Sequence, residues 1–198
     1  MNPLIPSAIS AIGPIVLCLL VIAAAWIDCN TFRIPNRLVG WGLASGLVLN
    51  MALPAGDGFF GVSPGALGIW QALGGAGVGL GLLFPLYLTC SMGAGDVKLM
   101  SMIGAFLGPS ATLTIILLSF ILGGTLSIVI AARNGKLRLM VTNIYEMLLG
   151  MIIYIPMAGT SRVQQPRQSA GRMPYALVIA GGLFLYLLST PLGEALFV

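Results

Sequence analysis

Long apolar runs broken by short polar segments are the feature that most constrains this chain. From Val97 to Ala132, about 36 residues include a single charged side chain, that of Lys98. Hydrophobic residues make up 58% of the chain and charged residues only 7%, whereas soluble domains carry about 25% charged residues. A soluble core of this size could not bury so much apolar side chain, so lipid must be the solvent. We therefore predict a single integral membrane domain, residues 1–198, of the all-α class.

The apolar runs predict a polytopic helix bundle with about six transmembrane helices. Gly108-Pro109-Ser110 breaks one long run into a short arm and a full one, and the short arm suits a half-length or tilted helix lined by protein. Closely spaced glycines in the third run predict tight helix packing. The expected spans are about residues 8–27, 38–53, 67–90, 97–107, 111–132 and 174–191.

The basic residues orient these spans. If the N-terminus and the C-terminus both lie outside and each span crosses once, all nine Lys and Arg residues fall on the cytoplasmic side. The stretch 139–157 has basic residues on both flanks, so we expect it to lie along the cytoplasmic interface or to dip in and return, within a cytoplasmic-side region 133–173. Basic clusters placed between apolar runs are typical of topology signals, so no nucleic-acid partner is expected.

Several classes of site are excluded by composition. The chain has no histidine, which excludes His-based catalytic triads, His-ligated zinc and haem held by histidine. Cys18, Cys29 and Cys90 are isolated, with no CxxC spacing, so neither a disulfide framework nor a zinc site is indicated. We expect no metal and no cofactor.

Two aspartates lie where ionisable groups are costly. Asp28 ends the first apolar run, and Asp96 follows the third run within Gly93-Ala94-Gly95-Asp96-Val97-Lys98. In the predicted topology both lie on the cytoplasmic side at similar depth. Two carboxylates held close share a proton and titrate as a pair, so one can activate water while the other protonates the carbonyl oxygen or the leaving amine. We predict that Asp28 and Asp96 form one catalytic pair, although Asp28 alone would also fit a helix-end anchor.

The residues around this pair have candidate supporting roles. Gly93 and Gly95 would let the backbone turn sharply and admit an extended substrate strand. Lys98 could stabilise negative charge or extend to the lipid headgroups. The segment Arg33-Ile34-Pro35-Asn36 contains an Ile-Pro pair that should stop a helix, and its arginine also fits a positive-inside loop.

At these two segments the chain resembles the type IV prepilin peptidases, the Gly-x-Gly-Asp aspartic proteases of membranes. The resemblance spans about residues 8–132, and the Pro174-Tyr175 pair also fits the short members of the family. The first motif, an Asp followed six residues later by Ile-Pro-Asn, is matched by Asp28, Ile34, Pro35 and Asn36. The second motif, Gly-x-Gly-Asp-x-Lys, is matched by Gly93, Gly95, Asp96 and Lys98.

The resemblance implies an aspartic endopeptidase that removes the leader peptides of prepilins and pseudopilins at the cytoplasmic face of the bacterial inner membrane. It implies Asp28 and Asp96 as the catalytic dyad, and the pilus assembly machinery as a further partner. Larger family members carry a cytoplasmic insert with paired CxxC motifs and also N-methylate their products. Asp28 comes too early for that insert, so the chain resembles the short class associated with Flp-type tight-adherence pili, and N-methyltransferase activity is not expected.

Other functions compete with this interpretation. Carboxylates in a membrane bundle and a broken helix also suit a proton-coupled transporter. Against it, no inverted repeat is evident and the acids gather at one face. A presenilin-like protease would carry a Tyr-Asp pair, which does not occur, and a structural pilus-platform subunit would not need two Asp motifs. Residues 139–172 are hypothesised to contact substrate at the interface.

Overall fold

A computed structural model describes residues 12–31, 33–60, 65–88, 92–154 and 175–190 of the chain. Helices account for most of this part, and it holds only one isolated β-bridge and no β-strand. The predicted all-α class is therefore confirmed. The helices are α2 (Ile12–Thr31), α3 (Asn36–Ala52), α4 (Ile69–Leu88), α5 (Ala94–Arg133), α6 (Leu137–Tyr154) and α7 (Tyr175–Leu188).

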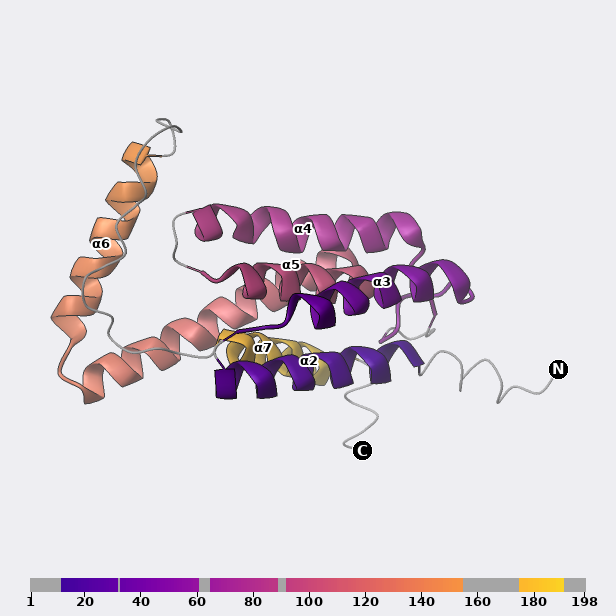
Figure 1. Cartoon of the computed structure of the whole chain (residues 1–198), viewed down its shortest axis with the longest axis horizontal. Coiled ribbons are helices and arrows are strands. Elements are labelled where there is room, and N and C mark those ends of the chain that lie inside the picture. The colour runs from indigo at the N-terminus through magenta and orange to yellow at the C-terminus, as the bar shows by residue number, and fades with distance from the viewer. Residues whose placement is uncertain (1–11, 32, 61–64, 89–91, 155–174, 191–198) are drawn as a thin grey trace.

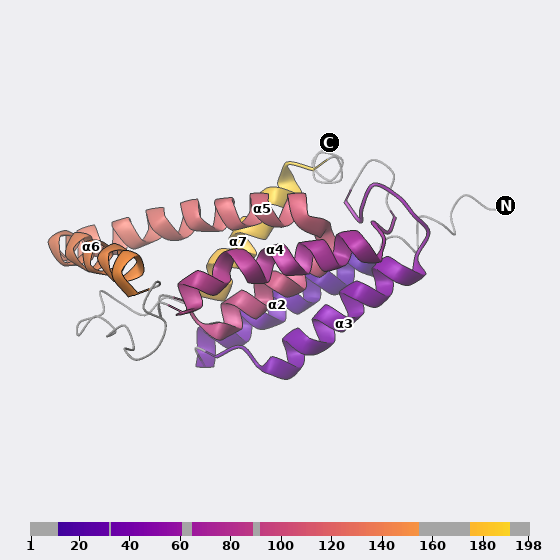
Figure 2. The ribbon, with the colours of Figure 1, turned by 90° about the horizontal axis from the view of Figure 1, so that it is seen from above.

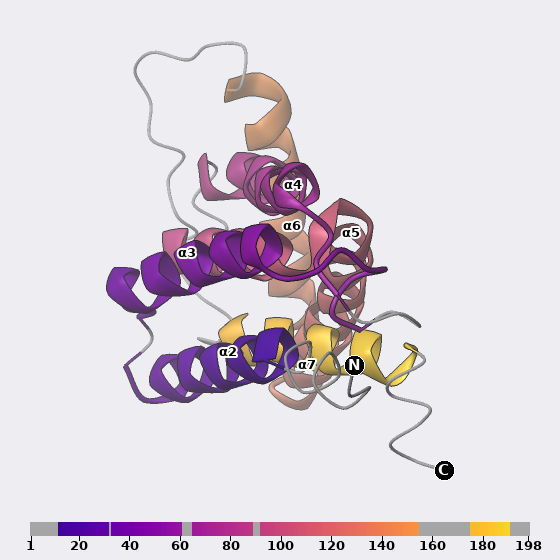
Figure 3. The same ribbon diagram turned by 90° about the vertical axis from the view of Figure 1, so that its right-hand side faces the viewer.

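The helices other than α6 run side by side along the long axis of the molecule (Figure 1). Figure 3, which looks along this bundle, places α4 and α2 at opposite edges. Between them, α5 contacts each of the other described helices. The first part of α5 is thus the centre of the bundle.

A break at Gly108 divides α5 into two arms, 94–107 and 109–133. Gly108 has φ 77° and ψ 176°, a left-handed region that side chains with a Cβ atom rarely adopt. Pro109 follows it and cannot donate the backbone hydrogen bond that would continue the helix. The second arm turns back toward the end at which the first arm began (Figure 2). The break predicted at Gly108-Pro109-Ser110 is therefore present, and it reverses the chain.

Asn50 of α3 replaces a backbone hydrogen bond that is lost at this break. Pro109 leaves the carbonyl of Ala105 without its helical partner, and the buried Asn50 amide donates to that oxygen at 2.9 Å. The Asn50 carbonyl oxygen also accepts a hydrogen bond from the backbone N–H of Leu67 at 2.9 Å. One side chain thus joins α3, the broken point of α5 and the segment before α4.

The first arm of α5 is buried because α4 presents glycines to it. Gly75 and Gly79 lie one turn apart, and a Cβ atom on Gly79 would come within 2.7 Å of the Met100 carbonyl oxygen. A Cβ atom on Gly75 would overlap the Gly104 backbone in the same way. Tight packing is therefore confirmed at these two glycines, whereas Gly77 and Gly81 face open space. Backbone-to-backbone approach of this kind is favoured by small residues spaced four apart.

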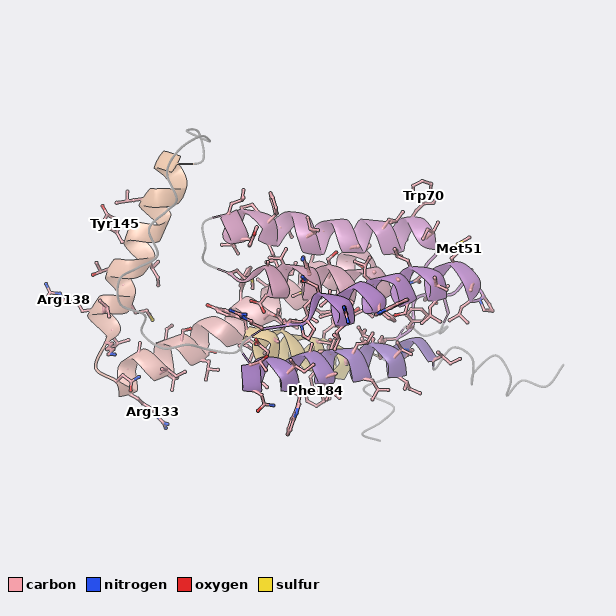
Figure 4. The ribbon with its side chains drawn as sticks, in the orientation of Figure 1. Met51, Trp70, Arg133, Arg138, Tyr145 and Phe184 are labelled. Atoms are coloured by element: carbon pink, nitrogen blue, oxygen red, sulfur yellow. The ribbon has the colours of Figure 1, made fainter. Side chains whose placement is uncertain are left out.

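The outer surface of the bundle is apolar. On α2, an exposed stripe recurs at helical spacing and includes Ile15, Leu19, Ile22 and Trp26, the inverse of the pattern on a soluble protein. Trp70 extends away from the bundle at the start of α4 (Figure 4). Within the described part, α2, α4 and α5 are long and apolar enough to cross a membrane, which indicates a membrane protein. The number of crossings and the sides of the termini stay predictions.

Two helix boundaries differ from those expected. The first helix continues past Asp28 to Thr31, and α5 begins at Ala94 instead of 97, so both aspartates lie inside helices. Helix α6 covers the stretch expected at the interface and lies across the bundle axis (Figure 1). That orientation is the one an interfacial helix requires.

We predict that Asn50→Leu destabilises the protein. Removal of the amide leaves the Ala105 carbonyl and the Leu67 N–H buried without partners, at a cost of about 1–3 kcal/mol. Thermal unfolding in detergent should show a lower transition temperature than wild type. The control is Asn30→Leu, because Asn30 is exposed and its amide bonds only within its own helix. Equal stability of Asn50→Leu and wild type would contradict this role.

Candidate active site

Asp28 lies inside α2 and faces the bundle. Leu17, Val21, Ala24 and Asp28 form one buried stripe at helical spacing, so the apolar face of the helix carries the carboxylate inward, where it is 7% exposed. A carboxylate in the last turns of a helix faces the negative end of the helix dipole. It therefore needs a donor from another element.

The start of α7 supplies that donor. The backbone N–H of Ala176, the second residue of α7, donates to Asp28 Oδ2 at 3.1 Å. The first N–H groups of a helix have no partner within the helix, and the positive end of the helix dipole favours a negative charge beside it. Asp28 thus caps α7 from a position 148 residues away in the sequence.

Asp96 occupies the third position of α5, after Gly93 at the N-cap. Its carboxylate hydrogen-bonds to the backbone of Gly93, which is the contact that the third residue makes in a capping box. The residue is 8% exposed, and the buried face of the first arm begins directly after it. The carboxylate is thereby held at the end of the central helix.

The two aspartates are brought together at one end of the bundle. The negative charge of Asp28 acts on the carboxyl group of Asp96 across the space between α2 and α5. Tyr175, at the start of α7, also interacts electrostatically with Asp96. Three segments that are distant in the sequence therefore converge here: the end of α2, the start of α5 and the start of α7 (Figure 1).

The two motif segments also contact each other directly. A Cβ atom on Gly95 would lie 3.2 Å from Cβ of Ile34, so these residues are in close contact. One turn later, Lys98 Nζ donates to Asn36 Oδ1 at 3.1 Å. The Ile-Pro-Asn segment is thus fastened to the first turn of α5 by one steric contact and one polar contact.

Gly93 does not make the sharp turn expected of it. Its φ of −73° and ψ of 146° are an extended conformation open to any residue, and the admission of an extended substrate strand stays a prediction. What Gly93 provides is space, because a Cβ atom there would lie 3.0 Å from Asp96 Oδ2. Both motif glycines therefore act through missing side chains and not through unusual backbone angles.

The remaining motif residues lie around the site without reaching it. Pro35 is the N-cap of α3 and ends the turn after α2, as its helix-stopping role predicts. Arg33 is exposed, and its side chain makes no hydrogen bond or ion pair with either aspartate in the part of the chain that the structure describes. Lys98 is also exposed and bonds to Asn36, so its direct partner is an amide.

Tyr175 and Ala176 are not among the predicted site residues, although the Pro174-Tyr175 pair is part of the family resemblance. The sequence carries one indication of this role. In the predicted topology the last apolar run begins on the side of the aspartates, and Tyr175 lies at its start. Within the described residues, no group of three Asp, Glu, Cys or His side chains could hold a metal ion. At the aspartate pair, the described residues supply two carboxyl groups, a phenol and backbone N–H groups.

We predict that Gly95→Leu destabilises the contact between the two motifs. The added side chain would press on Ile34, and overpacking of this kind costs about 1–3 kcal/mol. A lower unfolding temperature in detergent is expected, with partial recovery in Gly95→Leu combined with Ile34→Ala. The control Gly81→Leu adds the same side chain where nothing lies within 4 Å. Absence of recovery in the double variant would show that the contact is not the cause.

Comparison with known proteins is consistent with this geometry. No curated protein and no solved structure gives a match. The sequence profile described as the type IV leader peptidase family matches residues 15–128, more than half of the 198-residue chain. This range contains both aspartates and both motif segments. The chain therefore belongs to the type IV leader peptidase family.

Proposed function

We propose that this chain is a prepilin leader peptidase that hydrolyses its substrate with Asp28 and Asp96 as an aspartic dyad. The observation that carries the proposal is the convergence of these two buried carboxylates from separate helices at one end of an apolar bundle. Membership of the leader peptidase family supplies the reaction class, cleavage of a peptide bond. The chain's own residues supply a water-activating pair.

The proposed reaction needs one proton shared between the two carboxyl groups. The ionised carboxylate takes a proton from water, whose oxygen attacks the scissile carbonyl carbon, while the protonated carboxyl gives its proton to the carbonyl oxygen. The resulting diol collapses: the C–N bond breaks, the amine leaves with a proton from the newly protonated carboxyl, and one diol O–H returns a proton to the other carboxylate, so that the pair again shares one proton. Mutual repulsion of two close carboxylates keeps one of them protonated, so the pair is prepared for both steps.

The hydrogen bonds around the pair support these roles. Ala176 N–H holds Asp28, and the Gly93 backbone holds Asp96. Neither bond uses a charged partner, and among the residues that the structure describes neither aspartate forms an ion pair. Fixed backbone donors keep both oxygens in place without a large rearrangement during the reaction.

The proposed substrates are Flp-type prepilins and pseudopilins, cleaved at the cytoplasmic face of the inner membrane. The charge distribution supports the cytoplasmic placement of the site, because basic residues gather at the aspartate end of the bundle. Arg133 and Arg138 lie beyond that end (Figure 4). Lys98 lies two residues after Asp96 and bonds to Asn36, the neighbour of Arg37. Under the positive-inside rule this end faces the cytoplasm. Asp57 lies in the segment between α3 and α4 at the opposite end.

A proton-coupled transporter is less well supported. In such carriers the broken helix itself forms the ion site near the middle of the membrane. Here the break at Gly108 and the carboxylate of Asp96 are 12 residues apart on one arm, about 18 Å at 1.5 Å per residue. The acids and the break thus lie at opposite ends of the first arm.

We predict that Asp28→Asn and Asp96→Asn each lower kcat/KM for prepilin cleavage by about 10²–10⁴-fold, because each removes one proton-transfer group. Cleavage is measured as a mobility shift of a co-expressed prepilin, with enzyme levels matched between variants. The control is Asp57→Asn, which removes an exposed aspartate at the other end of the bundle and should cleave normally. Efficient cleavage by either site variant would refute the two-aspartate mechanism.

A further inference from the structure

An apolar groove opens beside the aspartate pair. Its volume is about 520 Å³, and its walls come from the end of α4, both arms of α5, the first turns of α6 and the start of α7. Met140 and Ile144 of α6 form one side of it, and Phe120 of the second arm forms another. The groove therefore lies between the bundle and α6, the helix that lies across the end of the bundle (Figure 1).

The groove is continuous with the proposed catalytic pair. Met100 lines it and lies four residues after Asp96, on the same face of α5. Met92, just before the second motif, is also part of the wall. Tyr175 belongs both to the groove and to the surroundings of Asp96, with which it interacts electrostatically. A chain lying in the groove would therefore reach the dyad at the start of α7.

The wall of the groove that the second arm of α5 forms has room for another helix to pack closely against it. Gly123 and Gly124 lie next to each other in the groove, and a Cβ atom on Gly124 would meet nothing within 4 Å. Small residues facing an apolar space let a second helix approach closely in a membrane. The methionines among the other lining residues adapt to side chains of varied shape.

We propose that this groove binds an apolar segment of the prepilin substrate next to the scissile bond, as a helix packed against the second arm of α5. The inference rests on the proposed function. The apolar segment is joined covalently to the bond that enters the dyad, so its first turns must lie within a few residues' reach of Asp96. Among the described surfaces, this groove is both apolar and continuous with that position.

The same geometry gives α6 a role. Met140 and Ile144 close the groove on the side away from the bundle, and within the described part α6 contacts no helix other than α5. Helix α6 then contacts the substrate near its leader junction, which agrees with the expectation that this segment is an interfacial element that contacts substrate.

The test is site-specific photo-crosslinking in the full chain in membranes. The crosslinking amino acid benzoylphenylalanine replaces Phe120, which lines the groove, or Val129, which is similarly exposed. These positions are nine residues apart on one helix and so face opposite directions. Both variants also carry Asp28→Asn, so that bound substrate is not consumed. The probe is a panel of Flp-type and other type IV prepilins from the source genome, together with wild-type cleavage of the same panel.

We expect a crosslink from position 120 to the apolar segment of a prepilin that wild type cleaves, at least fivefold stronger than from position 129. Equal crosslinks from both positions, a stronger one from 129, or crosslinks only to lipid would overturn the groove assignment while wild-type cleavage leaves the proposed function intact. Failure of wild type to cleave any prepilin in the panel would instead refute the proposed function and this inference with it.

A variant that fills the groove tests the proposal independently of crosslinking. Gly124→Leu fills the groove at a point with no neighbour to displace and should raise KM for prepilin at least tenfold with little change in kcat. Gly81→Leu, on α4 and outside the groove, is the matched control and should leave both constants unchanged. An unchanged KM in a well-folded Gly124→Leu enzyme would contradict the proposal.

Discussion

The close packing of α4 against the first arm of α5 is the constraint on which the rest of the structure depends. Gly75 and Gly79 allow the two backbones to touch, and the arm from Leu99 to Leu107 is buried as a result. Because the arm is fixed at the centre of the bundle, the residue at its start, Asp96, has a fixed position at the end of the bundle. The position of this proposed catalytic carboxylate therefore depends on the packing of α4 against α5.

The second requirement is that buried polar groups keep partners in an apolar environment. At one end of the first arm, Asn50 bonds the carbonyl that Pro109 leaves free. At the other end, Asp28 accepts from Ala176 and Asp96 bonds to the backbone of Gly93. At each of these places the donor or acceptor is a group freed at a helix end or break. The same local feature thus stabilises the fold at one end and holds the carboxylates at the other.

Much of the fold could be predicted from the sequence because its signals are local. Apolar runs give helices, Gly108-Pro109 gives the break, and glycines four apart give close packing. Both aspartates are expected at one end because successive apolar runs cross the membrane in alternate directions. The predicted boundaries were less accurate, since α2 extends past Asp28 and α5 begins before Asp96. Capping contacts determine such boundaries, and they involve residues outside the apolar runs.

Contacts between distant segments could not be predicted. Ala176 meets Asp28 across 148 residues, and Asn50 meets Ala105 across 55, yet neither pair carries a local pattern. The close contact of Gly95 with Ile34 could not be predicted either, because it depends on how the Ile-Pro-Asn segment packs on α5. The groove beside the pair depends on the angle between α5 and α6, which follows from packing alone.

The most direct test of the paired carboxylates is a ¹³C NMR pH titration of the full chain labelled at the aspartate carboxyl carbons. The chain has three aspartates, Asp28, Asp57 and Asp96, so each signal can be assigned with single Asn variants. The account predicts that Asp28→Asn changes the titration of Asp96, whereas Asp57→Asn leaves it unchanged. A titration of Asp96 that is the same with and without the Asp28 carboxylate would contradict the central claim that the two form one pair.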